Sequence, residues 1–195
     1  MKKIKSIAVY CGSSNNVPEH FKETAQQVGE MLAGHNIELV YGGGSQGLMG
    51  IVATSCLKAG GQVYGVIPGF LDNREGAYAG LTELHYVDSM HERKEMMYQR
   101  ADAFVILPGG LGTLDELFEI LTWKQVGLHN KLIIIMDVKR YWSALFVDFY
   151  DHLVKNGFVR AEDKNLFTLV ERVEDLTGFC NNEVTNQADY VSKWG

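Results

Sequence analysis

The sequence predicts an α/β fold in which a doubly wound parallel sheet of about seven strands carries helices on both faces. Short runs of β-branched and aliphatic residues alternate with longer segments of helical period, a pattern typical of βαβ units. Glycine-rich turns follow three of these runs, where strands lead into helices. At 195 residues and 46% hydrophobic content, the chain suits a single domain spanning residues 1–195, with a Rossmann-like sheet.

Seven runs rich in β-branched and aliphatic residues are the expected strands. They lie at Ser6–Cys11, Ile37–Tyr41, Gln62–Ile67, Leu84–Val87, Ala103–Leu107, Leu132–Met136 and Thr168–Val170. Helices are expected between most of them. The segment Pro68–Thr82 shows no regular period, so we expect a long loop of the kind that forms the rim of an active site. The tail after Asn181 stays unassigned.

The charge pattern argues against two classes of partner. The net charge is -6 and no block of five or six like charges occurs, whereas nucleic acids and anionic membranes attract clustered Lys and Arg. The apolar part of the N-terminal "MKKIKSIAVYCGSS" is about five residues long, too short for a signal peptide or a membrane span. We therefore expect a small-molecule ligand and neither a nucleic-acid nor a membrane partner.

The cysteines and histidines indicate neither disulfides nor a metal site. Cys11, Cys56 and Cys180 lie far apart without a C-x-x-C motif, which favours a reducing, cytoplasmic location. The six histidines show no pair at ligand spacing on a common helix face. We therefore expect no catalytic metal.

Three glycine-rich turns carry the functional prediction. They read "CGSS" (residues 11–14), "YGGGSQGLMG" (41–50) and "PGGLGT" (108–113). In an open parallel sheet such turns emerge at the carboxyl edge, near the point where strand order reverses. Glycines let backbone amides approach an anion, and each following helix offers unpaired amides and a positive dipole end. The turns are predicted to converge on a phosphate. The candidate contacts are Ser14, Gly43, Gly44, Gly109, Gly110 and Gly112.

Rival interpretations of these turns fit less well. Gly42 and Gly47 have the spacing of a Walker A loop, but Leu48 and Met49 replace its Lys and hydroxyl residue. A G-x-G-x-x-G pattern is present, yet the next strand ends without the acid that would bind a ribose, so a dinucleotide enzyme is a weak second choice. No G-x-S-x-G motif supports a serine hydrolase. Each turn taken alone could also be only a tight turn that permits close helix packing.

The segment "PGGLGTLDE" ends in the pattern of a complete helix start. Thr113 takes the place of an N-cap, and Glu116 stands three residues on, where a carboxylate can bond back to the cap. A carboxylate about 6 Å from a phosphate would cost roughly 3 kcal/mol per phosphate charge at an effective dielectric near 20. Glu116 therefore needs either a compensating cation or a chemical role.

A second charged helix is predicted over residues 88–102. Ser89 is its expected N-cap and Glu92 stands at the capping-box position. The guanidinium of Arg93 suits a carboxylate or a phosphate, so Arg93 is a candidate partner for Glu116 or for a nucleotide. The alternative is a solvated helix face, because the charges of residues 92–95 alternate in sign.

Two apolar stripes accompany these helix starts. The stripe of the first helix is predicted to contain Leu114, Leu117, Phe118, Leu121 and Leu128, and that of the second Met90, Met97 and Ala101. Thr122 lies off the centre of its stripe, where it could face the ligand or water.

Taken together, "PGGLGTLDE" and "SMHERKEMM" resemble the "lonely guy" family, the cytokinin riboside 5′-monophosphate phosphoribohydrolases and their bacterial AMP-hydrolysing relatives. The family motif P-G-G-x-G-T-x-x-E is matched throughout, and the likeness extends from "VYCGSS" to about residue 170. The resemblance implies that Arg93 and Glu116 are the catalytic pair. It places Lys94, Gly109, Gly110, Gly112, Thr113, Thr122 and Glu75 around the nucleotide. Departures at "NREGAYAG" and at Leu111 leave the preferred base open.

The activity that the resemblance implies is hydrolysis of the N-glycosidic bond in adenosine 5′-monophosphates, with or without an N6 substituent. The products are the free base and ribose 5-phosphate. No cofactor is implied, and the family is homodimeric. Its members have often been labelled lysine decarboxylases, but no lysine is placed to anchor pyridoxal phosphate. The alternative is a non-catalytic carrier of a nucleotide or of the molybdenum cofactor, from which Arg93 together with Glu116 distinguishes an enzyme.

Overall fold

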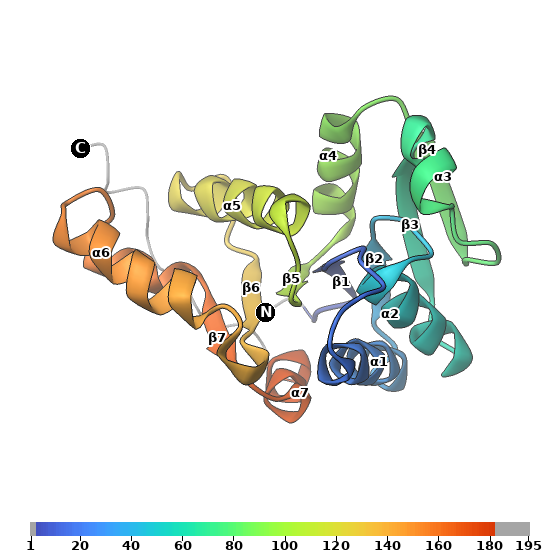
Figure 1. Ribbon diagram of the computed structural model, residues 1–195, viewed down its shortest axis with the longest axis horizontal. Helices are drawn as coiled ribbons and strands as arrows, with labels where there is room; N and C mark the ends of the chain where they lie inside the picture. The colour runs from blue at the N-terminus through green and yellow to red at the C-terminus, as the bar shows by residue number, and fades with distance from the viewer. Residues whose placement is uncertain (1–2, 182–195) are drawn as a thin grey trace.

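A computed structural model describes residues 3–181 of the chain. Seven strands form one parallel sheet in the order β4-β3-β2-β1-β5-β6-β7 (Figure 1). The strands are β1 (Ser6–Tyr10), β2 (Glu38–Tyr41), β3 (Val63–Pro68), β4 (Glu83–Val87), β5 (Ala103–Ile106), β6 (Leu132–Met136) and β7 (Thr168–Val170). Each predicted strand is found with its boundaries shifted by at most one residue. The predicted fold class is confirmed.

Helices cover both faces of the sheet. The α-helices are α1 (Glu19–Gly34), α2 (Gly47–Lys58), α3 (Gly69–Glu75), α4 (Met90–Arg100), α5 (Leu111–Gln125), α6 (Tyr150–Lys155) and α7 (Val173–Asn181). Two 3-10 turns, η1 (Val138–Arg140) and η3 (Ala161–Leu166), and the π-helical η2 (Ala144–Phe149) complete the connections. Helices α1, α2 and α7 bury their apolar residues in one core, and α4, α5 and η2 bury theirs in the other (Figure 1).

Strand order reverses between β1 and β5. From β1 the chain moves outward through β2 and β3 to β4, then returns through α4 to β5 on the other side of β1. Central strands are buried on both faces, which is why β5 and β6 read as unbroken apolar runs rather than as alternating patterns. The β1/β5 crevice is the place where open sheets of this kind bind ligands.

The prediction of an irregular loop over Pro68–Thr82 is wrong in its first half. Residues Gly69–Glu75 form α3, which follows β3 directly. A seven-residue helix spans two turns at most, too few for a helical period to stand out in the sequence. The helix ends at Gly76, which adopts φ 65°, and the Asp72 carboxylate accepts hydrogen bonds from Ala77 N at 2.7 Å and from the Tyr86 hydroxyl at 3.0 Å.

The helix start predicted at Thr113 is also wrong, whereas the start predicted at Ser89 is confirmed. Helix α5 begins three residues upstream with Gly110 as its N-cap, and no side chain caps it. At α4, Ser89 Oγ accepts a hydrogen bond from Glu92 N at 3.1 Å. Glycine is tolerated as an N-cap, so a Thr within the first turn does not fix where a helix begins.

The predicted apolar stripe of α5 is only partly buried. Leu117 and Leu121 lie in the core, but Phe118 is 40% exposed. Leu128 lies beyond the end of the helix and is 67% exposed. The stripe was extended one turn too far, because Gly127 at φ 83° turns the chain out of the helical direction. On α4, Met97 and Ala101 are buried as predicted, and Met90 is half-buried.

Within residues 3–181, no helix combines the length and apolar character needed to cross a membrane.

Candidate active site

A cavity of about 200 Å³ opens at the crevice between β1 and β5. Arg93 of α4 and Glu116 of α5 both line it, so the structure brings the predicted catalytic pair together from two helices. Gly110, Gly112 and Thr113 at the start of α5 line it as well. Five predicted site residues thus share one small cavity at the carboxyl edge of the sheet.

Backbone carbonyls hold the side chain of Arg93 in place. One terminal nitrogen donates to Gly42 O at 2.8 Å, Nε donates to Val66 O at 3.2 Å, and the residue is only 5% exposed. A Cβ on Gly42 would lie 1.8 Å from that terminal nitrogen. Gly42 therefore lacks a side chain because the guanidinium occupies the space, a requirement separate from phosphate approach.

Glu116 lies in the second turn of α5 and is 9% exposed. Burial raises the pKa of the Tyr10 phenol well above its usual value, and the charge of Glu116 raises that pKa further. Burial and the same carboxylate also raise the pKa of the Cys11 thiol. Both groups line the cavity and keep their protons near neutral pH, so Cys11 is not a thiolate nucleophile.

The earlier start of α5 separates Glu116 from any capping role. Helix capping involves the first turn, whereas Glu116 is the sixth helical residue of α5. Thr113 instead packs over the turn before the helix, because a Cβ on Gly109 would lie 2.1 Å from Thr113 Oγ1. The unpaired amides of the first turn, at Leu111 to Thr113, are thereby presented at the cavity, where they favour an anion.

The three glycine-rich turns contact one another. Gly12 N donates to Pro108 O at 3.0 Å, and Leu48 N donates to Gly12 O at 3.0 Å. Gly47 adopts φ 58°, and a Cβ there would lie 2.4 Å from the backbone carbon of Ser13. Side chains at these positions would force the turns apart, so the glycines permit the convergence that the sequence predicts.

Lys94 lies beside the cavity rather than in it. Its ammonium forms ion pairs with Asp115 at 3.1 Å and with Glu119 at 3.0 Å. Burial alone would lower the pKa of Lys94, but the hydrogen bonds to Glu119 and Asp115 outweigh burial, so the pKa is raised. The two acids precede and follow Glu116 on α5. Lys94 therefore joins α4 to α5 at the level of Arg93 and Glu116.

The second glycine-rich turn is covered by the segment that follows α3. Gly44 forms an antiparallel bridge with Ala77, and Tyr78 N donates to Gly43 O at 3.0 Å. Neither Gly43 nor Gly44 lines the small cavity. Glu75 is the last residue of α3, and the carbonyl of the next residue, Gly76, accepts from Ser45 N at 3.0 Å, so the Glu75 backbone lies beside this turn.

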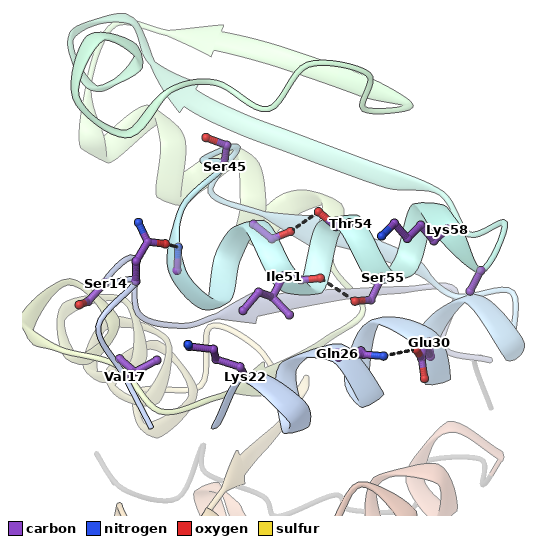
Figure 2. A pocket seen from close by; sticks show the side chains of 14 residues that line it. Ser14, Val17, Lys22, Gln26, Glu30, Ser45, Ile51, Thr54, Ser55 and Lys58 are labelled. Carbon is purple, nitrogen blue, oxygen red and sulfur yellow. Dashed lines mark hydrogen bonds between the residues drawn. The ribbon is translucent and has the colours of Figure 1, made fainter. Parts of the chain in front are cut away.

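Two predicted site residues lie elsewhere. Ser14 lines a larger hollow of about 750 Å³ between α1 and α2, with Lys22 on one wall and Ile51 on the other (Figure 2). Thr122 donates to Phe118 O at 2.7 Å and lines an apolar hollow of about 190 Å³ between α5 and η2–α6. Within the chain as described, Thr122 does not join Arg93 and Glu116.

Sequence analysis missed three residues at the site. Met49 and Met97 give the cavity a flexible apolar wall. Tyr141, which follows β6, donates from its hydroxyl to Gly109 O at 2.8 Å. Tyr141 is separated from Gly109 by 32 positions, and no local pattern connects them. In the described part of the chain, no group of three His, Cys, Asp or Glu side chains is placed to hold a metal ion.

Comparison with known proteins extends this description. The family model described as "Possible lysine decarboxylase" matches residues 49–179. A cytokinin riboside 5′-monophosphate phosphoribohydrolase of Arabidopsis thaliana is 40% identical over 191 residues, covering 98% of this chain and 89% of the relative. The enzyme of that name from Rhodococcoides fascians is 39% identical over 171 residues, covering 87% and 86%.

Solved structures match at lower identity. The molybdenum cofactor carrier protein of Chlamydomonas reinhardtii superposes with a TM-score of 0.68 at 18% identity, covering 91% of this chain and 96% of the carrier. A likeness at this identity establishes the shared fold only.

The fold and the site together define a class: a Rossmann-like α/β protein with a small cavity that holds an acid and a cation beside a helix N-terminus. Within that class, the similarity over nearly the whole chain decides the family. The chain belongs to the family of the cytokinin riboside 5′-monophosphate phosphoribohydrolases, whose model carries the lysine decarboxylase description.

Proposed function

We propose that this protein hydrolyses the N-glycosidic bond of adenosine 5′-monophosphates, including N6-substituted ones, to the free base and ribose 5-phosphate. The observation that carries the proposal is the placement of Arg93 and Glu116 in one cavity beside the α5 N-terminus. The curated relatives bear the name of this activity over most of the chain length.

The proposed mechanism assigns one task to each part of the site. The amides at the start of α5 hold the 5′-phosphate. The bond electrons leave with the base, which takes up the proton that the attacking water gives up. The Glu116 carboxylate stabilises the oxocarbenium-like sugar while it orients or deprotonates that water. Arg93, fixed by Gly42 O and Val66 O, positions the sugar and phosphate against Glu116.

The test is a product assay with AMP and isopentenyladenosine monophosphate. Wild-type protein should release the base and ribose 5-phosphate, and Glu116→Gln should abolish release while retaining nucleotide binding. The ratio of the two rates identifies the preferred base. Full activity of Glu116→Gln would show that the carboxylate has been assigned wrongly, and binding without turnover by the wild type would contradict the hydrolase.

Binding without turnover is what the second candidate, a non-catalytic carrier, predicts. Its support is the fold shared with molybdenum cofactor carriers. A carrier has no need of a carboxylate beside its anion site, so the acid at Glu116 favours the hydrolase. Lysine decarboxylation is not proposed, because the ammonium of Lys94, which lies beside the cavity, is held by two carboxylates.

A homodimer in the cytoplasm also belongs to the proposal. Supporting the dimer, apolar side chains are exposed along α5 and η2, with Leu111 at 86%, Phe118 at 40% and Phe149 at 48%. Supporting a reducing location, all three cysteines are free and buried. Sedimentation at assay concentration should give twice the chain mass, whereas a monomer with full activity would contradict the dimer.

A further inference from the structure

The carbonyl oxygen of Gly109 accepts a hydrogen bond from Tyr141, a residue outside the cavity. Tyr141 donates its hydroxyl proton to Gly109 O at 2.8 Å, yet Tyr141 does not line the cavity. Gly109 and Gly110 form the peptide that precedes α5. A glycine pair restricts backbone rotation least, so this peptide plane can turn over more easily than any other in the motif. An external hydrogen bond is therefore the contact that decides its orientation.

The orientation of this peptide sets what the cavity presents to an anion. In a trans peptide the C=O and the following N–H point in opposite directions. Fixing Gly109 O toward Tyr141 turns the Gly110 amide away from Tyr141, and Gly110 is a cavity residue. Within residues 3–181, no hydrogen bond acceptor is found for the Gly110 amide. With the plane reversed, a carbonyl oxygen would replace this donor and repel a phosphate.

The backbone that delivers Tyr141 is in a disfavoured conformation. Lys139 and Arg140 adopt φ 52° and 61°, in the left-handed region that non-glycine residues rarely occupy. The buried Asp137 compensates, because its carboxylate accepts from Trp142 N at 2.7 Å and from Ser143 Oγ at 2.5 Å. Backbone strain that surrounding contacts hold in place clusters at functional sites.

The ring of Tyr141 is fixed from two sides as well. Phe21 of α1 packs against it edge-on with ring centroids 5.4 Å apart, and Trp142 does so at 4.8 Å. Although 43% of Tyr141 is exposed, its hydroxyl therefore approaches Gly109 in one direction. The conformation of residues 137–143 serves to bring this hydroxyl to the glycine turn.

From these contacts we infer that Tyr141 is a positioning residue for phosphate recognition: its hydroxyl holds the Gly109–Gly110 peptide so that the Gly110 amide donates to the 5′-phosphate. The inference deepens the proposed function and rests on it for the identity of the substrate. Tyr141 touches no reacting atom and acts through the peptide.

The test is Tyr141→Phe, which removes the hydroxyl and keeps the ring contacts. Binding of ribose 5-phosphate, AMP and adenosine is measured by calorimetry. The two phosphorylated ligands should bind about 5- to 10-fold more weakly, as expected for the loss of one neutral hydrogen bond, here that from the Tyr141 hydroxyl to Gly109 O. Adenosine should bind as it does to the wild type. With AMP as substrate, KM should rise by the same factor while kcat changes by less than about 2-fold.

Tyr98→Phe is the matched control, since Tyr98 is half-buried at the other end of the sheet and should leave all three affinities unchanged. Unchanged binding of ribose 5-phosphate to Tyr141→Phe, or an equal loss for adenosine and AMP, would overturn the inference. The inference would also be overturned if the wild type bound AMP no more tightly than adenosine. The results for ribose 5-phosphate and adenosine are independent of AMP turnover, so a wild type that fails to hydrolyse AMP counts against the proposed function alone.

Discussion

The two ends of α5 treat buried charge in opposite ways. At its N-terminal end, Lys94 is paired with two carboxylates that flank Glu116, and its pKa is raised. At its C-terminal end, Lys124 is 7% exposed, and the hydrogen bond described for its ammonium goes to a carbonyl, Lys131 O, at 2.9 Å. Burial there lowers the pKa of Lys124 to about 8.

His129 shares the C-terminal end of α5, and burial disfavours its charged form as well. One ring nitrogen lies 2.9 Å from Ile120 O, and the other accepts from Lys131 N at 3.1 Å. Burial is the first cause that lowers the pKa of His129 to about 4, and the charges of Lys124 and Lys131 lower it further. At the N-terminal end of α5, where catalysis is proposed, the buried ammonium of Lys94 is compensated by two carboxylates. At the C-terminal end, burying the charged forms of Lys124 and His129 costs stability.

Gly42→Ala should have the largest effect, on activity. Moving the guanidinium of Arg93 by more than an ångström to make room for the Cβ should reduce kcat/KM on the order of 100- to 1,000-fold. Gly34→Ala is the control, because nothing lies within 4 Å of a Cβ there. AMP hydrolysis by both variants is compared, and near-normal turnover by Gly42→Ala would mean that Arg93 need not be held by this carbonyl.

The next effect concerns acid stability. The unfolded chain takes a proton on His129 near pH 6.5, whereas the folded protein resists it down to about pH 4. The unfolded state therefore binds more protons in this window, and the free energy of unfolding should fall by roughly 2 to 3 kcal/mol as the pH drops through it.

Urea unfolding of wild type and His129→Gln at pH 7.0, 5.5 and 4.5 measures this contribution as the difference between the two proteins. His152→Gln, at an exposed position on α6, should follow the wild type. A constant difference between wild type and His129→Gln across these pH values would contradict the prediction.

Lys94→Met should reduce kcat about 10-fold, because Asp115 and Glu119, which flank Glu116 on α5, would lose their shared cation and α4 would lose its link to α5. Lys94→Arg should restore most of the rate. Lys164→Met removes a surface ion pair with Asp151 and should change nothing. Equal rates for Met and Arg at position 94 would show that charge is not what matters there.

The smallest expected effect is a gain. Lys124→Met should raise the free energy of unfolding by about 1 kcal/mol at pH 7, because it removes a buried charge that has no opposite partner within residues 3–181. The gain should shrink from pH 8 to pH 10, since the folded wild type releases its proton in that range before the unfolded chain does. Exposed Lys155→Met is the control, and a loss of stability in Lys124→Met would show that its bond to Lys131 O outweighs the burial cost.

The strands could be predicted because buried parallel strands impose a local pattern. Val105 and Ile134, for example, lie in short apolar runs that are buried along their whole length. Sequence motifs identified Arg93 and Glu116 as site candidates. The parallel topology places the starts of α4 and α5 at the same edge of the sheet, which brings the two residues together. The partners of Lys94 could not be predicted, because they depend on how α4 crosses α5. Tyr141 could not either, since its role depends on a non-local contact and on backbone angles that the sequence "VKRYW" does not announce.

The guanidinium of Arg93 occupies the space that a side chain at position 42 would need, and this limits how the sequence can vary. Positions 42 and 93 are 51 residues apart, yet they share one volume. Alanine at 42 is harmful only while arginine stands at 93, so the two substitutions should be strongly non-additive in stability. In an Arg93→Ala background, Gly42→Ala should cost little. In evolution, the glycine at position 42 can be replaced only after the arginine has been lost.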